Sequence, residues 1–315
     1  MISYLEFEKP VAALETRIAE LRALAESDDV DIAQELARLE RKSAEMLESS
    51  YASLTPWQKT QVARHPQRPH FRDYVAEMFD DFMPLGGDRL YGNDEAIMGG
   101  FATLQGRKVM LIGHEKGNDT QSRLRHNFGM GKPEGYRKAI RLMELAGRFG
   151  LPVVTLVDTS GAFPGIEAEE RGQAEAIARS TEACLGLPVP MVATIVGEGG
   201  SGGAVALASA ERVLMLEHAV YSVISPEGCA SILWRTGEKA PQAAEAMKVT
   251  AQDLASLNVI DRIVKEPVGG AHRDPRSTAE NLSNAICEEL DSLSQMDPGQ
   301  LKQLREERFL AIGRL

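Results

Sequence analysis

Apolar residues recur every three or four positions through the first part of the chain, a spacing typical of amphipathic helices. Residues 5–49 carry two such stripes and are predicted to form a helical hairpin. Another helix is predicted from Thr55, where a capping-box sequence precedes Pro56, and a further one over residues 69–80. We therefore expect residues 1–83 to be a helical segment whose apolar stripes pack on another surface.

The pattern changes at residue 84, where short apolar runs typical of strands begin to alternate with helical segments. The first two runs form a predicted hairpin around Gln105-Gly106. The next elements alternate along the chain: a helix over 133–149, a strand over 152–158, a helix over 166–185 and a strand over 189–196. Because strands joined by a crossover helix run parallel, residues 84–268 are predicted to be an α/β domain. Residues 269–315 are predicted to close the fold with two amphipathic helices.

Composition narrows the class of protein. The chain has 315 residues, and its 46 acidic and 35 basic side chains give a formal net charge of −11, which argues against nucleic-acid or anionic-membrane partners. No apolar run approaches the length of a membrane span and the N-terminus lacks the pattern of a signal peptide, so we expect a cytoplasmic protein. Cys184, Cys229 and Cys287 are widely spaced, so we expect neither a disulfide framework nor a metal site in this chain.

The most distinctive stretch is Met191–Glu211, in which a β-branched run leads through a glycine-rich turn into a helix of small residues. Five glycines fall within seven positions of this turn: Gly197, Gly199, Gly200, Gly202 and Gly203. Glycine lets backbone N–H groups approach a ligand closely, and the first N–H groups of a helix have no partner within the helix. The turn is therefore predicted to offer donors to a phosphate or to a developing oxyanion.

The glycines of this turn also suggest three other interpretations, and the sequence argues against the first two. A nucleotide-binding P-loop requires GxxxxGK[ST], and neither a lysine nor a threonine follows these glycines. Gly197, Gly199 and Gly202 have the spacing of a dinucleotide fingerprint, which is a weak pattern without a suitably placed acidic residue. The third interpretation is a connection in which small residues merely allow a helix and a strand to pack closely.

A second glycine turn, Asp158–Gly165, also follows a predicted strand and precedes a predicted helix. Open α/β sheets bind ligands at the carboxyl ends of their strands, and both turns lie at such ends. The intervening stretch His114–Lys132 is predicted to be irregular and is locally cationic. Its basic residues include Lys116, Arg123 and Arg125. We expect this stretch to be either a solvated loop or a cradle for a phosphorylated ligand.

The glycine turns resemble those of the crotonase superfamily, in which repeated β-β-α units place two backbone N–H groups around a thioester oxygen. Gly197 and Ser201-Gly202-Gly203 match the superfamily's G-x-x-x-G-G-G segment, and Asp158–Gly165 matches its first oxyanion turn. Longer runs are similar to the carboxyltransferase alpha-subunit family of bacterial acetyl-CoA carboxylase, over nearly the whole chain. These runs are NFGMGKPEGYRKAIRLM, DTSGAFPGIEAEERGQAEAIAR, GEGGSGGAVAL and KAPQAAEAMKVTAQDL. Ser160 and Asn118 depart from that family's pattern, which has proline and arginine there.

The resemblance implies a crotonase-like fold and the transfer of a carboxyl group from carboxybiotin, held by a biotin carboxyl carrier protein, to acetyl-CoA. The product, malonyl-CoA, supplies fatty-acid synthesis. It also implies an α2β2 assembly with a zinc-containing beta subunit, and a separate biotin carboxylase that consumes ATP. The implied catalytic residues are Gly202, Gly203, Gly161 and Ala162. The implied binding residues for the biotin and CoA groups are Gly199, Gly200, Ser201, Lys116, Arg123 and Arg125.

Two rival hypotheses remain at this level. An enoyl-CoA hydratase or isomerase of the same fold needs two glutamates, and the matching positions here are Val205 and Glu227. A valine cannot transfer protons, which weighs against this activity. A non-catalytic scaffold subunit is suggested by the predicted helical hairpin, whereas the paired glycine turns argue against a purely structural role.

Overall fold

The computed structural model describes residues 3–27 and 33–313. The strands of this described part are β1 (Phe79–Pro84), β2 (Ile97–Leu104), β3 (Arg107–His114), β4 (Val153–Thr159), β5 (Met191–Gly200), β6 (Arg212–Leu216), β7 (Val220–Ser222) and β8 (Arg262–Val264). They form one sheet in the order β1-β2-β3-β4-β5-β6-β8, and β7 pairs with the end of β5. The strands β3, β4, β5, β6 and β8 run parallel, as predicted for units joined by crossover helices.

The helices of the N-terminal half are α1 (Lys9–Ser27), α2 (Ala33–Ala52), α3 (Pro56–Ala63), α4 (Phe71–Met78), α5 (Thr120–Arg125) and α6 (Pro133–Phe149). Those of the C-terminal half are α7 (Ile166–Glu170), α8 (Gln173–Gly186), α9 (Ser201–Ala208), α10 (Pro226–Trp234), α11 (Ala240–Met247), α12 (Ala251–Ser256), α13 (Pro275–Leu293) and α14 (Pro298–Ala311). Short 3-10 turns lie at Glu6–Glu8, Asn127–Gly129 and Gly237–Lys239.

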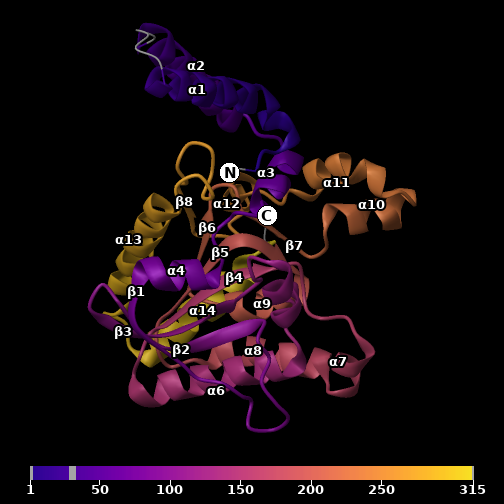
Figure 1. Cartoon of the computed structure of the whole chain (residues 1–315). Coiled ribbons are helices and arrows are strands. Elements are labelled where there is room, and N and C mark those ends of the chain that lie inside the picture. The colour runs from indigo at the N-terminus through magenta and orange to yellow at the C-terminus, as the bar shows by residue number, and fades with distance from the viewer. Residues whose placement is uncertain (1–2, 28–32, 314–315) are drawn as a thin grey trace.

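The central strands are buried on both faces by helices. Every residue of β4 and β5 is buried, which explains why residues 153–157 and 191–196 are mostly apolar. α6 packs on β2 and β3, α9 packs on β4 and β5, and α8 packs on α6 and α9. α4 packs on β1, and α13 packs on β5 and β8. Figure 1 shows α6 and α8 on one side of the sheet and α4 and α13 on the other.

Local sequence explains several of the predicted elements. Gln105 and Gly106 have φ values of 46° and 81°, so both central residues of the β2–β3 turn are left-handed, as a tight hairpin requires. The Thr55 side chain accepts a hydrogen bond from the Gln58 N–H and Pro56 begins α3, which confirms the predicted capping box. α6 begins with Pro133 and ends at Gly150, whose φ of 65° gives a left-handed cap.

Several predicted elements differ from the structure. The helix expected over residues 69–80 ends at Met78, and β1 begins at Phe79, so the sheet starts before the predicted boundary at residue 84. The single helix expected over residues 166–185 is two helices, because Gly172 between α7 and α8 is left-handed with a φ of 79°. The irregular stretch His114–Lys132 contains α5, which the Asp119 side chain caps.

The N-terminal helices form the predicted hairpin, which projects from the body in Figure 1. The polar residues Ser27, Asp28 and Asp29 predict a turn between these two helices. Ser27 is the last residue of α1, and Asp28 and Asp29 lie outside the described residues. At the base of the hairpin, the Tyr51 hydroxyl donates to Glu8 over 3.0 Å, and Arg273 of the body bonds to Glu15 over 2.8 Å. None of the helices in residues 3–27 and 33–313 is long and apolar enough to cross a membrane.

Candidate active site

The two glycine turns lie at the carboxyl ends of neighbouring parallel strands. β4 ends at Thr159 and leads into the first turn, while β5 extends through Gly200, beyond the predicted end of the strand at residue 196. α9 then begins at Ser201, so Gly202 and Gly203 lie in the first helical turn, as predicted. Ser201 itself is left-handed with a φ of 52°, which makes the change of direction from strand to helix.

The turns are in direct contact. A Cβ atom added to Gly203 would lie 2.8 Å from Ala162 N and 2.8 Å from Gly161 C. A Cβ atom added to Gly200 would lie 2.2 Å from Ser160 O. Side chains at these two positions would therefore push the first turn away, so the close approach of the turns requires glycine at both. The structure thus brings the predicted residues of the two turns together.

The candidate donors at this contact are the backbone N–H groups at the start of α9 and in the first glycine turn. α9 has no side-chain cap, so the N–H groups of its first turn, including those of Gly202 and Gly203, have no partner within the helix. They also lie at the positive end of the α9 dipole. The Gly161 N–H already donates to Thr159 Oγ1 over 3.1 Å. The Ala162 N–H is therefore the better candidate donor of the first turn.

The two positions that correspond to the hydratase glutamates do not form an acid–base pair. Val205 is exposed and faces a cavity of about 340 Å³ that Ser201, Tyr221, Met247 and other residues line. Glu227 is bound to Arg64 over 2.6 Å. Burial raises the pKa of Glu227, but the hydrogen bond and charge of Arg64 outweigh it and hold that pKa below its ordinary value.

Arg64 also joins the glycine turn to the N-terminal helices. Its guanidinium bonds to both carboxylate oxygens of Glu198, over 2.6 and 3.1 Å, as well as to Glu227. Glu198 lies among the glycines at the end of β5 and is buried. No local sequence pattern marks Arg64, because its two partners lie 134 and 163 positions away along the chain.

The cationic stretch is divided between two sites. Lys116 and Arg123 line a cavity of about 220 Å³ together with Arg64, His70 and Ser160, so this cavity opens beside the first glycine turn. Arg125, from the same stretch, forms an ion pair with Glu95 and lines a separate cavity of about 160 Å³. The structure thus brings Lys116 and Arg123 to the first glycine turn and places Arg125 elsewhere.

Lys116 forms an ion pair with a carboxylate, whereas Arg123 contacts carbonyl oxygens. The Lys116 ammonium lies 2.6 Å from the buried carboxylate of Asp158. Among the residues that the structure describes, Arg123 donates only to the carbonyl oxygens of Gly117 and Pro66, each over 3.4 Å. Arg123 is therefore better placed than Lys116 to contact an anionic group that enters the cavity.

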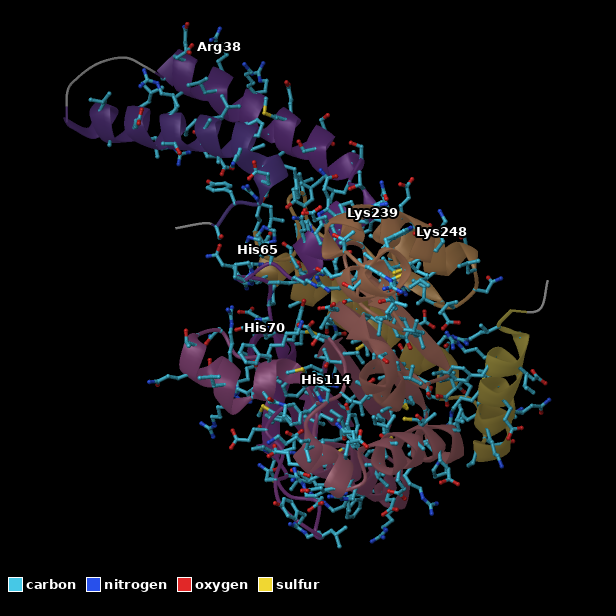
Figure 2. All side chains as sticks on the ribbon, turned by 90° about the vertical axis from the view of Figure 1, so that its right-hand side faces the viewer. Arg38, His65, His70, His114, Lys239 and Lys248 are labelled. Atoms are coloured by element: carbon cyan, nitrogen blue, oxygen red, sulfur yellow. The ribbon has the colours of Figure 1, made fainter. Side chains whose placement is uncertain are left out.

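One group of possible metal ligands lies outside this site. Glu8, His65 and His272 place one ligand atom each within 4.8 Å of one another. His65 Nδ1 accepts the Gln67 N–H over 3.2 Å and its Nε2 contacts the Ser3 carbonyl over 2.9 Å, so neither nitrogen is free for a metal. Figure 2 shows His65 where the N-terminal hairpin meets the body. These contacts explain the group as part of that junction.

Comparisons with known proteins identify the family. Residues 4–313 match the family described as acetyl co-enzyme A carboxylase carboxyltransferase-like. The chain belongs to this family. It is 82% identical over 313 residues to an acetyl-coenzyme A carboxylase carboxyl transferase subunit alpha from Erythrobacter litoralis, covering 99% of this chain and 100% of that relative. It is 70% identical over 313 residues to the subunit of the same name from Rhizorhabdus wittichii, with the same coverage.

Solved structures of carboxyltransferases confirm the crotonase-like fold. The match to transcarboxylase 12S has a TM-score of 0.59 and 19% identity, covering 72% of this chain and 42% of that one. The match to the beta subunit of geranyl-CoA carboxylase from P. aeruginosa has a TM-score of 0.55 and 19% identity, covering 76% of this chain and 46% of that one. The family match and the named relatives confirm the enzyme class predicted from the sequence, a carboxyltransferase.

Ser160 and Asn118, the two departures from the family's pattern, are exposed near the cavity that Lys116 and Arg123 line. Ser160 is exposed and lines the cavity. Asn118 donates its N–H to Ser122 Oγ over 3.1 Å. Neither position replaces a glycine of the two turns, so the donor arrangement is intact, whereas an arginine at position 118 would have added a positive charge to this loop.

Proposed function

We propose that this chain is the alpha subunit of a carboxyltransferase that moves a carboxyl group from carboxybiotin to acetyl-CoA, giving malonyl-CoA for fatty-acid synthesis in the cytoplasm. The observation that carries the proposal is the contact between the two glycine turns, which places Gly203 at the start of α9 against Gly161 and Ala162. The named relatives support the same reaction.

The chemistry of this transfer fits a site built from backbone donors. Carboxybiotin that gives up CO2 leaves negative charge on the ureido oxygen of biotin, and acetyl-CoA that loses a methyl proton carries negative charge on its thioester oxygen. Preorganised N–H groups stabilise such oxyanions, and the biotin anion can act as the base. We propose that Gly202, Gly203, Ala162 and Gly161 form this site. Gly199, Gly200 and Ser201 would lie against the bound groups, and Arg123 would contact the CoA phosphates, with Lys116 and Arg125 as weaker candidates for that contact.

The proposed partners are those that the family resemblance implies. We propose an α2β2 assembly with a zinc-containing beta subunit that supplies the second oxyanion site. A biotin carboxyl carrier protein would deliver carboxybiotin, and a biotin carboxylase would recharge it. The term "subunit alpha" in the names of the relatives supports assembly with other chains.

Reconstitution tests this function. The purified chain alone is expected to form no malonyl-CoA from carboxybiotin and acetyl-CoA, and transfer is expected to appear when the beta subunit is added. Malonyl-CoA formation is followed with the beta subunit alone as the control. Robust transfer by this chain without a partner, or none with both subunits folded and associated, would contradict the proposal.

An enoyl-CoA hydratase or isomerase is the second candidate, and Glu227 separates it from the first. Glu227→Gln is expected to lower kcat for carboxyl transfer by less than about tenfold, because a base derived from biotin makes this carboxylate dispensable, whereas general acid–base groups supply about 10²- to 10⁴-fold. The rate is measured in the assembled complex. A loss within that larger range, with the assembly intact, would favour the hydratase-like mechanism.

A further inference from the structure

The pairing between β4 and β5 is interrupted just before the glycine turns. Val157 pairs with Ile195, but Thr159 pairs with Gly199, so Asp158 of β4 faces the three residues 196–198 of β5. Such a bulge bends a strand and leaves backbone groups without ladder partners. The bulge therefore sets the direction in which β5 enters the second glycine turn.

Two buried side chains supply the missing partners. Arg68 Nε donates to the Val196 carbonyl over 2.8 Å, and the Glu198 N–H donates to Asp158 Oδ1 over 2.9 Å. Gly197 lies between these contacts, and a Cβ atom there would come within 2.4 Å of Asp158 Oδ1. The carboxylate of Asp158 thus holds the bulge from a position directly before the first glycine turn.

Side chains from two other segments contact the Asp158 carboxylate. Lys116 Nζ lies 2.6 Å from Oδ1, and His70 Nδ1 lies 3.4 Å from Oδ2. The Asp158 side chain is only 2% exposed. Burial alone raises its pKa, but the charge of Lys116 and the hydrogen bond from His70 outweigh it and hold the pKa of Asp158 well below its usual range.

We propose that Asp158 is a positioning residue that fixes the second glycine turn against the first, and that Lys116 serves as its counter-charge. The inference rests on the proposed function, since the geometry that Asp158 fixes is that of the oxyanion donors. It assigns Lys116 to Asp158 rather than to a CoA phosphate. A misplacement of about 1 Å in such a site costs on the order of 10²-fold in rate.

A double-mutant cycle separates the two roles of Lys116. Lys116→Met and Asp158→Asn are each expected to lower kcat by about tenfold or more, because each leaves one charge without its partner. The double variant K116M/D158N is expected to be no slower than the slower single variant, because it removes both charges together. The KM for acetyl-CoA is expected to stay within about threefold throughout, since the donors act on the transition state.

The conservative replacement tests the hydrogen bond to Glu198. Asparagine keeps an oxygen that accepts the Glu198 N–H, whereas alanine does not. K116M/D158N is therefore expected to be at least about fivefold faster than K116M/D158A, a difference of the size that single hydrogen bonds contribute. Arg123→Ala serves as the comparison for phosphate binding, with a raised KM for acetyl-CoA. Lys302→Met, on α14, is the control for loss of an exposed lysine.

Amide hydrogen exchange gives a readout that does not depend on activity. Peptides covering residues 196–203 are expected to exchange faster in K116M/D158A than in K116M/D158N, and to be unchanged in Lys302→Met. The positioning role is overturned if Lys116→Met raises the KM for acetyl-CoA whatever residue stands at 158, or if the Ala and Asn double variants match in both rate and exchange. An inactive wild-type complex with the expected exchange pattern would instead overturn the proposed function alone.

Discussion

Gly203→Ala is expected to lower kcat for carboxyl transfer by about 10²- to 10³-fold, the usual effect of losing one oxyanion donor. The new Cβ atom would lie 2.8 Å from backbone atoms of Gly161 and Ala162, closer than real Cβ contacts come. The first turn must then move away from α9, which misaligns the donors on both sides of the contact. The rate is measured in the complex with the beta subunit, and the melting temperature is followed alongside it.

Two further glycine variants show whether the contact itself is responsible. A Cβ atom at Gly202 would meet only the Ile177 side chain, at 3.3 Å, so Gly202→Ala is expected to cost less than Gly203→Ala. Gly186 at the end of α8 has open space around its Cβ position, and Gly186→Ala is the control for a glycine replaced outside the site. If Gly203→Ala kept nearly normal kcat, or lost activity only by unfolding, the contact would be a packing feature and the site assignment would be wrong.

Arg305→Met is expected to destabilise the chain by about 3–5 kcal/mol, the usual cost of removing one partner from a buried ion pair. Arg305 and Glu211 are both fully buried and lie 2.9 Å apart. Arg305 also donates to the carbonyls of Cys184 and Leu185, so it caps the C-terminal end of α8. Without it, the buried Glu211 carboxylate loses its counter-charge and these carbonyls lose their donor.

Unfolding by urea measures this prediction, with Lys302→Met as the matched control. Lys302 lies on the same helix in an exposed ion pair with Glu306, and its replacement is expected to change the free energy of unfolding by less than about 0.5 kcal/mol. The double variant R305M/E211M is expected to recover part of the loss, because the uncompensated charge is gone while the carbonyls of α8 stay unpaired. Equal stability of Arg305→Met and the control would contradict the role given to this ion pair.

The sequence predicted the parts of the fold that depend on neighbours along the chain. Local residue preferences for turns and helix ends explain three of these parts: the hairpin at Gln105-Gly106, the cap at Thr55, and the position of Gly202 in the first turn of α9. The break at Gly172 was missed because the helical pattern continues on both sides of one left-handed residue. β1 was missed because its pairing with β2 outweighs its polar sequence.

The sequence predicted the backbone turns of the candidate site but not the side-chain contacts around them. The glycines of both turns mark places where backbone atoms approach closely, and that signal is local. Contacts between distant charges carry no such signal: Arg64 with Glu198 joins α3 to β5, and Lys116 with Asp158 joins the cationic stretch to β4. These pairs depend on the folded sheet, and they change the role expected for Lys116.

The ion pair between Arg305 and Glu211 also affects how the chain can fold during its synthesis. The two residues are 94 positions apart. At roughly 5–20 residues per second, the ribosome adds Arg305 about 5–20 seconds after Glu211. Until then Glu211 lacks the ion pair with Arg305. The contact between α14 and the end of α8 can therefore form only after α14 has left the ribosome. The last helix therefore governs when the core of a newly made chain becomes complete.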